Sequence, residues 1–172
     1  MKPMNLTNNS ELKVIFLDID GVLNSEKFYK DLSQYIRWKK AKEEGKSRDE
    51  QIAIASIDPE AVQWVWYIIN HTQASLVISS TWRSDVKLSE KFKYMGLPEF
   101  IDITPSTIQR HRGTEIQMWL DAHPDVKNYV ILDDDTDMLD SQYEHFVHIS
   151  YEEGLNEEFA NKAINILNNG NC

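Results

Sequence analysis

Two aspartates stand two positions apart where an apolar segment ends, in the stretch "KVIFLDIDGVLNS" of residues 13–25. Side chains alternate in direction along an extended segment, so Asp18 and Asp20 project to one side and Ile19 projects to the other. Carboxylates in this position can act as nucleophiles, as proton donors, or as ligands of a hard cation. Asp20-Gly21 alone would be weak evidence, because Asp-Gly is a common turn sequence. The apolar segment directly before it favours a chemical role, with Gly21 allowing a sharp turn.

Three other polar groups follow apolar segments or begin a helix. "SSTWRS" (79–84) offers hydroxyls and a guanidinium, "DDDTD" (133–137) offers carboxylates, and "QRHRGTE" (109–115) places Arg110 and Arg112 at a helix start. Several carboxylates in one crevice repel one another, and a divalent cation with a preference for oxygen ligands, such as Mg²⁺, relieves that repulsion. Hydroxyls and arginines suit a phosphate instead. Together these groups indicate phosphoryl transfer.

The elements that must position these residues alternate along the chain. Short apolar strands are predicted at 13–18, 74–79, 100–104, 128–133 and 145–150, and helices at 59–71, 84–96, 113–123 and 156–169. Asp58 and Pro59 are a strong helix start, and the charged segment 26–50 is roughly helical with a break at Gly45. Alternating apolar strands and helices predict an α/β fold with a central parallel sheet covered on both faces. Ligands bind such sheets beyond the carboxyl ends of the strands, where the polar groups lie.

Four segments, "FLDIDGVL", "LVISS", "HRGTEI" and "VILDDDTD", resemble in sequence and order the four motifs of the haloacid dehalogenase (HAD) superfamily. The resemblance implies a Rossmannoid three-layer sandwich with a minimal cap. Residues 1–172 would form a single HAD-like hydrolase domain, with residues 24–58 as a flap or small helical cap insertion. "SSTWRS", "RGTEIQMWL" and "EEGLNEEFANKAINIL" further resemble the HAD domains of RNA-repair proteins of the polynucleotide phosphatase type.

The resemblance also implies a role for each site residue. Asp18 would be the nucleophile that forms an aspartyl-phosphate, and Asp20 would be the acid and base, which points to a phosphatase. Mg²⁺ would lie between Asp18, the backbone carbonyl of Asp20, and Asp133 or Asp134. The phosphate would be held by the following residues: Gly21, Ser79, Ser80, Arg83 and Arg112.

Several of these assignments have structural alternatives. Ser79 and Ser80 could instead cap the next helix, and Arg83 could pair with a surface acid. Arg112 stands where the family usually has a lysine, and "RHR" leaves open whether Arg110 or Arg112 is the active base.

Charge bears on the substrate. The chain carries a net charge of −10, which disfavours non-specific binding of nucleic acid over the whole surface. Residues 26–50, however, hold eight Lys/Arg against six acids, with Tyr35 and Trp38 among them. Such a segment suits single-stranded nucleic acid, but it is equally compatible with an exposed helix of mixed charge.

Three functions therefore remain open. The preferred one is a Mg²⁺-dependent phosphatase of nucleic-acid ends. The second is a phosphatase of small metabolites or nucleotides, with residues 26–50 as a lid, and the third is a non-catalytic phosphate- or partner-binding module. The stretch between Asp20 and Ser79 is too short for a large cap domain, which favours an open site.

The only cysteine is Cys172, and no apolar run is long enough to cross a membrane. We expect a cytoplasmic protein with a phosphorylated substrate and no membrane partner. The sequence carries no signal for the oligomeric state.

Overall fold

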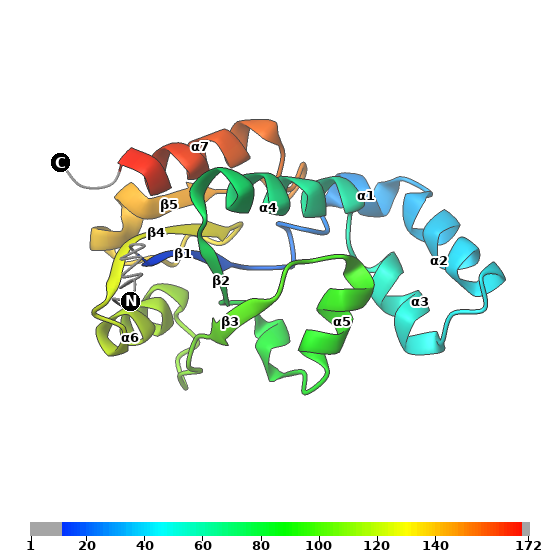
Figure 1. Ribbon diagram of the computed structural model, residues 1–172, viewed down its shortest axis with the longest axis horizontal. Coiled ribbons are helices and arrows are strands. Elements are labelled where there is room, and N and C mark those ends of the chain that lie inside the picture. The colour runs from blue at the N-terminus through cyan, green and yellow to red at the C-terminus, as the bar shows by residue number, and fades with distance from the viewer. Residues whose placement is uncertain (1–11, 170–172) are drawn as a thin grey trace, which may run out of the picture.

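Five parallel strands form one sheet in the computed structural model, which describes residues 12–169 (Figure 1). The strand order is β3-β2-β1-β4-β5, and each neighbouring pair is parallel. The strands are β1 (Leu12–Leu17), β2 (Ser75–Ile78), β3 (Phe100–Ile103), β4 (Val126–Asp133) and β5 (Phe146–His148). The predicted parallel α/β fold is confirmed.

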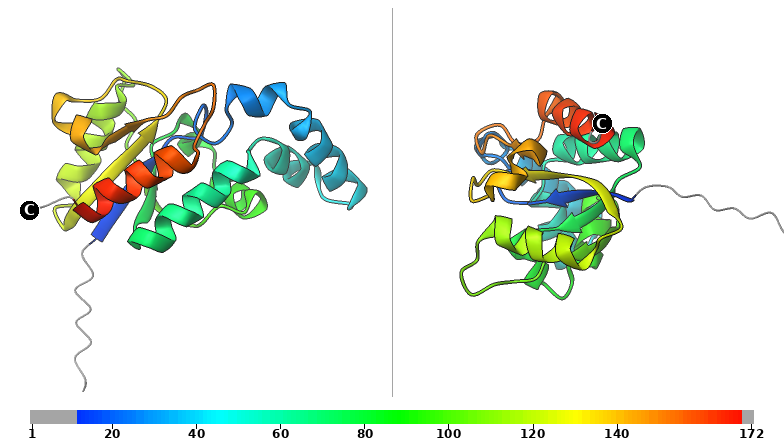
Figure 2. Two further views of the ribbon diagram at one scale, coloured as in Figure 1. Left: turned by 90° about the horizontal axis from the view of Figure 1, so that it is seen from above. Right: turned by 90° about the vertical axis from the view of Figure 1, so that its left-hand side faces the viewer.

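Helices cover both faces of the sheet, which gives three layers (Figure 2). On one face lie α4 (Pro59–Thr72) and α7 (Glu157–Asn169), and on the other lies α6 (Arg112–Ala122). The central strand shows why both faces need a cover. Ile15 and Leu17 belong to the core under α4 and α7, whereas Val14 and Phe16 belong to the core under α6. A continuous apolar strand therefore fills two cores at once.

A group of short helices lies beyond the carboxyl ends of the strands. The segment after β1 forms α1 (Glu26–Lys30), α2 (Ser33–Glu43) and α3 (Arg48–Ala55), and α2 and α3 project away from the sheet (Figure 1). The helices break at Gly45, as predicted, because the residue has a φ of 73°. Lys87 pairs with Asp49 on α3 at 2.7 Å, and the Arg37 Nε on α2 donates to the Ile54 carbonyl at 3.0 Å. These contacts join α2 to α3 and α3 to the sheet domain.

The start of one predicted helix was wrong. Residues 84–96 were expected to form a single helix, but α5 begins only at Leu88 (Leu88–Met95) and is preceded by a 3₁₀ turn, η1 (Thr81–Ser84). The Ser80 hydroxyl accepts from the Trp82 N–H, and the Asp85 carboxylate accepts from the Lys87 N–H at 2.8 Å. Ser80 therefore caps η1, and Asp85 caps the turn that leads into α5. A second 3₁₀ turn, η2 (Asp140–His145), leads into β5.

The remaining helices follow the expected signals closely. The Asp58 carboxylate accepts from the Glu60 N–H at 2.9 Å, with Pro59 at the first helical position of α4. Within residues 12–169, no helix is both long and apolar enough to cross a membrane.

Candidate active site

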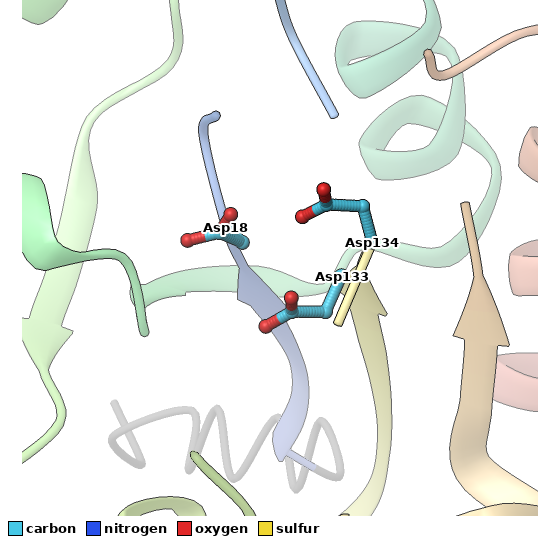
Figure 3. Close-up of side chains that lie close together, drawn as sticks. All are labelled: Asp18, Asp133 and Asp134. Atoms are coloured by element: carbon cyan, nitrogen blue, oxygen red, sulfur yellow. The ribbon is translucent and has the colours of Figure 1, made fainter. Parts of the chain in front are cut away.

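The acidic residues singled out in the sequence meet at the carboxyl ends of β1 and β4. Asp18 follows β1, Asp133 ends β4, and Asp134 comes next (Figure 3). Each of the three offers a carboxylate oxygen, and these oxygens all lie within 4.8 Å of one another. Asp18 and Asp133 are buried, while Asp134 is half-buried. Adjacent parallel strands bring these carboxylates together, since their ends share one edge of the sheet.

Crowding of buried carboxylates shifts their protonation. Burial raises the pKa of Asp18 to about 6, with Arg112 and the Ser80 hydroxyl opposing the shift. Burial and then the charge of Asp18 raise the pKa of Asp133 to about 8, and burial also raises the pKa of Asp134. The ionised site is thus short of positive charge. Three oxygen ligands with this deficit fit a divalent metal ion of the Mg²⁺ class.

Arg112 supplies positive charge to the acidic group. Its Nη2 donates to the Asp18 Oδ1 at 3.1 Å, and its Nε forms an ion pair with the Asp133 Oδ2 at 2.9 Å. The residue opens α6, whose first N–H donates to the Asp137 carboxylate at 2.8 Å. Asp137 therefore fixes the helix end from which the guanidinium reaches the carboxylates.

Gly113 allows that helix end to approach the loop after β4. A Cβ at this position would lie 2.5 Å from the backbone nitrogen of Leu139, which no side chain tolerates. The Gln142 amide also donates to the Gly113 carbonyl at 2.8 Å. Close backbone packing at Gly113 thus brings α6 against the loop that carries Asp137.

Ser79 and Ser80 follow β2 and have different surroundings. Both side chains are buried. The Ser79 hydroxyl has no hydrogen-bond partner, which is costly for a buried polar group, whereas the Ser80 hydroxyl caps η1. Helix capping, the structural alternative for both serines, therefore describes Ser80. The Ser79 hydroxyl is thus a buried polar group without a partner at the end of the strand beside β1.

Arg83 is held in place by an ion pair with a buried acid, Glu115. Its Nη2 pairs with the Glu115 Oε2 at 2.6 Å, and its Nη1 donates to the Ser79 carbonyl at 2.5 Å and to the Thr104 hydroxyl at 3.3 Å. Glu115 is 2% exposed and also accepts from the Thr107 N–H. These bonds tie η1, the loop after β3 and α6 together. The geometry gives Arg83 a positioning role for Ser79, and its contact with phosphate stays a prediction.

Asp20 differs from Asp18 in being exposed. Its Oδ1 accepts from the Asn24 amide and its Oδ2 from the Trp82 indole Nε1, both at 2.9 Å. The Asn24 Oδ1 in turn accepts from the Gly21 N–H at 2.9 Å. Two donors from different segments thus aim the Asp20 carboxylate, a contact that the sequence did not indicate for Trp82.

Gly21 has a steric reason to be glycine. Its φ is 77°, and a Cβ there would lie 2.3 Å from the Asp134 Oδ2. Any side chain would displace a carboxylate of the acidic group. The sharp turn expected from the sequence therefore also leaves space for Asp134.

Comparison with known families bears on this geometry. The family model described as the HAD domain in Swiss Army Knife RNA repair proteins matches residues 14–160. The chain belongs to this family. Searches of curated proteins and of solved structures found no match.

The four motif resemblances are thus confirmed as those of a HAD domain, and this family supports a phosphatase-like hydrolase function. HAD proteins usually use a metal ion, and the buried cluster of Asp18, Asp133 and Asp134 in this HAD domain could hold one.

The structure also separates the two candidate arginines of the third motif. Arg110 is exposed, has a φ of 52°, and lines a cavity of about 670 Å³ to which Asp18, Asp133 and Asp134 do not contribute. Arg112, by contrast, contacts Asp18 and Asp133 directly. We therefore assign the third-motif role in this HAD domain to Arg112.

Replacing Arg112 by alanine is expected to lower kcat/KM for p-nitrophenyl phosphate by about 10²–10³-fold, because a preorganised positive group is lost from the reacting centre. Arg110→Ala is the matched control and is expected to change kcat/KM by less than about threefold, as for an exposed charge. Thermal unfolding of both variants checks that the fold is retained. A larger loss in Arg110→Ala than in Arg112→Ala would reverse the assignment.

Proposed function

We propose that this HAD domain is a Mg²⁺-dependent phosphatase that hydrolyses a phosphomonoester through an aspartyl-phosphate on Asp18, and that its substrate is a phosphorylated nucleic-acid end. The observation that carries the proposal is the convergence of Asp18, Asp133 and Asp134, of which the first two pair with the Arg112 guanidinium. Two buried aspartates paired with an arginine, with a third half-buried aspartate beside them, form a charged site that suits a metal and a phosphate.

The residues divide the reaction between them. An Asp18 carboxylate oxygen attacks phosphorus as the bond to the leaving oxygen breaks, and Asp20 gives that oxygen a proton. Water then attacks the phosphorus of the aspartyl-phosphate, its proton passes to Asp20, and the Asp18 carboxylate is regenerated. Arg112 and the Ser79 hydroxyl hold the phosphoryl oxygens. Mg²⁺, held by Asp18, the Asp20 carbonyl, and Asp133 or Asp134, would offset the charge on the phosphoryl group.

The two N–H donors on Asp20 match this cycle. The Asn24 amide donates to one Asp20 oxygen and the Trp82 indole to the other, which holds the carboxyl group in a fixed direction. Each oxygen has a second lone pair, so Asp20 can carry the proton that it gives to the leaving oxygen while both donors stay in place.

A nucleic-acid end is favoured over a small metabolite by the way the cap is attached. Helices α2 and α3 are hydrogen-bonded to each other through Arg37, and α3 buries Ala53 in the main core of the sheet domain. A fixed cap leaves the entrance open to the end of a long molecule, whereas a lid would need to close over a small one. The match to the HAD domain in RNA-repair proteins also supports a nucleic-acid end.

The test is phosphate release from a defined panel. We expect hydrolysis of p-nitrophenyl phosphate that requires Mg²⁺ and stops when EDTA is added. A second panel holds single-stranded oligonucleotides with a 3′- or 5′-phosphate, mononucleotides, and sugar phosphates, and we expect the highest kcat/KM for an oligonucleotide end. Release restricted to sugar phosphates would favour the metabolite alternative. No release from any member by the folded protein with Mg²⁺ present would favour the non-catalytic module.

A further inference from the structure

Aromatic side chains from three separate segments gather around Asp20. Trp82 comes from η1, Tyr29 from α1, and Tyr151 from the loop between β5 and α7. The Trp82 Nε1 donates to the Asp20 Oδ2 at 2.9 Å. The loop that carries Tyr151 is hydrogen-bonded to the start of α1, since the Glu26 N–H donates to the Tyr151 carbonyl at 2.9 Å and the Lys27 N–H to the Glu152 carbonyl at 3.0 Å. These bonds bring the segment of Tyr151 against the helix that carries Tyr29.

The electrostatics of Tyr29 agree with this arrangement. Partial burial raises the pKa of its phenol, and the charges of Asp20 and Tyr151 raise the pKa further. The action of these charges on the Tyr29 hydroxyl agrees with the backbone contacts between α1 and the loop that carries Tyr151.

The two tyrosine rings are left facing solvent. Tyr29 is 45% exposed and Tyr151 is 51% exposed, while Phe28, next to Tyr29, is buried at 4%. Phe28 thus anchors α1 to the core, and Tyr29 adds nothing comparable to the packing. Rings exposed together beside a catalytic side chain indicate a binding surface.

The position of Asp20 says which part of a substrate meets these rings. As the proton donor, Asp20 lies against the leaving oxygen, so its neighbours surround the leaving group and not the phosphate. Charges of both signs lie nearby, because Glu152 and Glu153 are exposed beside Tyr151 while Lys30 on α1 lies close to Glu152. Flat aromatic rings attract a nucleobase by stacking.

We propose that Tyr29, Trp82 and Tyr151 form a leaving-group subsite that holds the nucleobase of the phosphorylated nucleotide. This inference rests on the proposed phosphatase function and narrows its substrate to one that carries a base next to the scissile phosphate. Tyr29 and Tyr151 supply the exposed rings. Trp82 is half-buried and packs against the main core, and its indole nitrogen donates to Asp20.

The experiment compares substrates that differ only in the base. Adenosine 5′-monophosphate is set against ribose 5-phosphate, and a 5′-phosphorylated oligonucleotide is set against the same strand with an abasic terminal residue. The readout is the ratio of kcat/KM values within each pair. We expect the base to raise kcat/KM by about tenfold or more, mainly through KM, and Tyr29→Leu with Tyr151→Leu to bring the ratio close to one. The phenylalanine variants should restore the ratio, because they keep the rings.

A matched variant and a rival position complete the design. Tyr143 is 51% exposed like Tyr151 but lies in η2, and Tyr143→Leu should keep the ratio of the unaltered protein. Tyr35, on α2, is the rival aromatic residue. A ratio that falls with Tyr35→Leu and not with the Tyr29 and Tyr151 changes would overturn the proposal, and so would an unaltered protein that treats both members of each pair alike.

Binding to a catalytically inactive protein separates this inference from the proposed function. Asp18→Asn is titrated with adenosine 5′-monophosphate and with ribose 5-phosphate while tryptophan fluorescence is followed. Tighter binding of the nucleotide by about tenfold supports the subsite even if no turnover is seen, in which case the phosphatase function fails alone. Turnover of both compounds with equal Kd values means that the subsite fails alone. Preference for adenosine monophosphate over the oligonucleotide would identify a free nucleotide as the source of the base.

Discussion

Asp18→Asn is expected to lower phosphate release by about 10⁴-fold or more, because the variant lacks the atom that attacks phosphorus. The side chain keeps its shape, and the neutral amide suits a buried position where the pKa of the carboxyl is already raised to about 6. Arg112 retains Asp133 as an ion-pair partner at 2.9 Å. The variant should therefore fold, and circular dichroism and thermal unfolding alongside kcat will separate a chemical loss from a structural one.

Asp20→Asn is the companion variant and should behave differently. Removing a general acid and base costs about 10²–10⁴-fold in rate. With p-nitrophenyl phosphate the leaving group needs little protonation, so phosphorylation of Asp18 should continue while hydrolysis of the aspartyl-phosphate slows. Rapid-mixing kinetics should then show a burst of p-nitrophenolate, which Asp18→Asn lacks. Near-normal activity of Asp18→Asn would exclude an aspartyl-phosphate on that residue.

The fold followed from the sequence because its strongest signals are local. Every residue of "VIFL" at 14–17 is fully buried, which is the property that predicted a strand covered on both faces. The order of such strands along the chain then placed Asp18, Ser79 and Asp133 at one edge of the sheet. Secondary structure and topology thus sufficed to assemble the acidic group without any knowledge of side-chain packing.

The partners of the site residues could not be predicted in that way, because they are set by packing between distant segments. Trp82 and Asp20 are 62 positions apart, and Glu115 is 32 positions from Arg83. Neither pair leaves a periodic or local pattern in the sequence. The same holds for Asp137, which "DDDTD" presents as one acid among several but which caps α6 behind Arg112. Asn24 was the easiest of the missed residues to predict, since it stands four positions after Asp20 on the same turn.

The start of α5 was predicted wrongly for a different reason. Ser80 and Asp85 are each acceptable helix starts, and the sequence pattern cannot say that both are used, one for η1 and one for the turn before α5. The consequence reaches the site, because η1 carries Trp82 and Arg83 and directs them to Asp20 and Glu115.

Mg²⁺ is expected to stabilise the folded protein, and more so at pH 8 than at pH 5.5. In the metal-free protein the pKa of Asp133 is raised to about 8 and that of Asp18 to about 6, so the folded state retains protons that the unfolded state has lost above pH 4. The metal-free folded state therefore loses stability as pH rises from about 4 to about 8. Mg²⁺ needs the ionised carboxylates, so its binding gains strength over the same pH range.

At a Mg²⁺ concentration of about 100 times Kd, linkage gives about 2.7 kcal/mol, which corresponds to a rise in Tm of about 5–10 °C for a chain of this size. Differential scanning fluorimetry with and without Mg²⁺, at pH 5.5 and pH 8, measures this rise in Tm. Asp133→Asn is the matched variant, because Asp133 is fully buried and the amide keeps its shape without its charge. In that variant the metal-free protein should lose less stability between the two pH values, and the rise with Mg²⁺ should fall below about 2 °C. A rise that survives in Asp133→Asn and is lost in Asp134→Asn would make Asp134 the ligand. A rise that is equal at both pH values, or that survives in both variants, would mean that the cation binds elsewhere and that the acidic group is held together by Arg112 and retained protons alone.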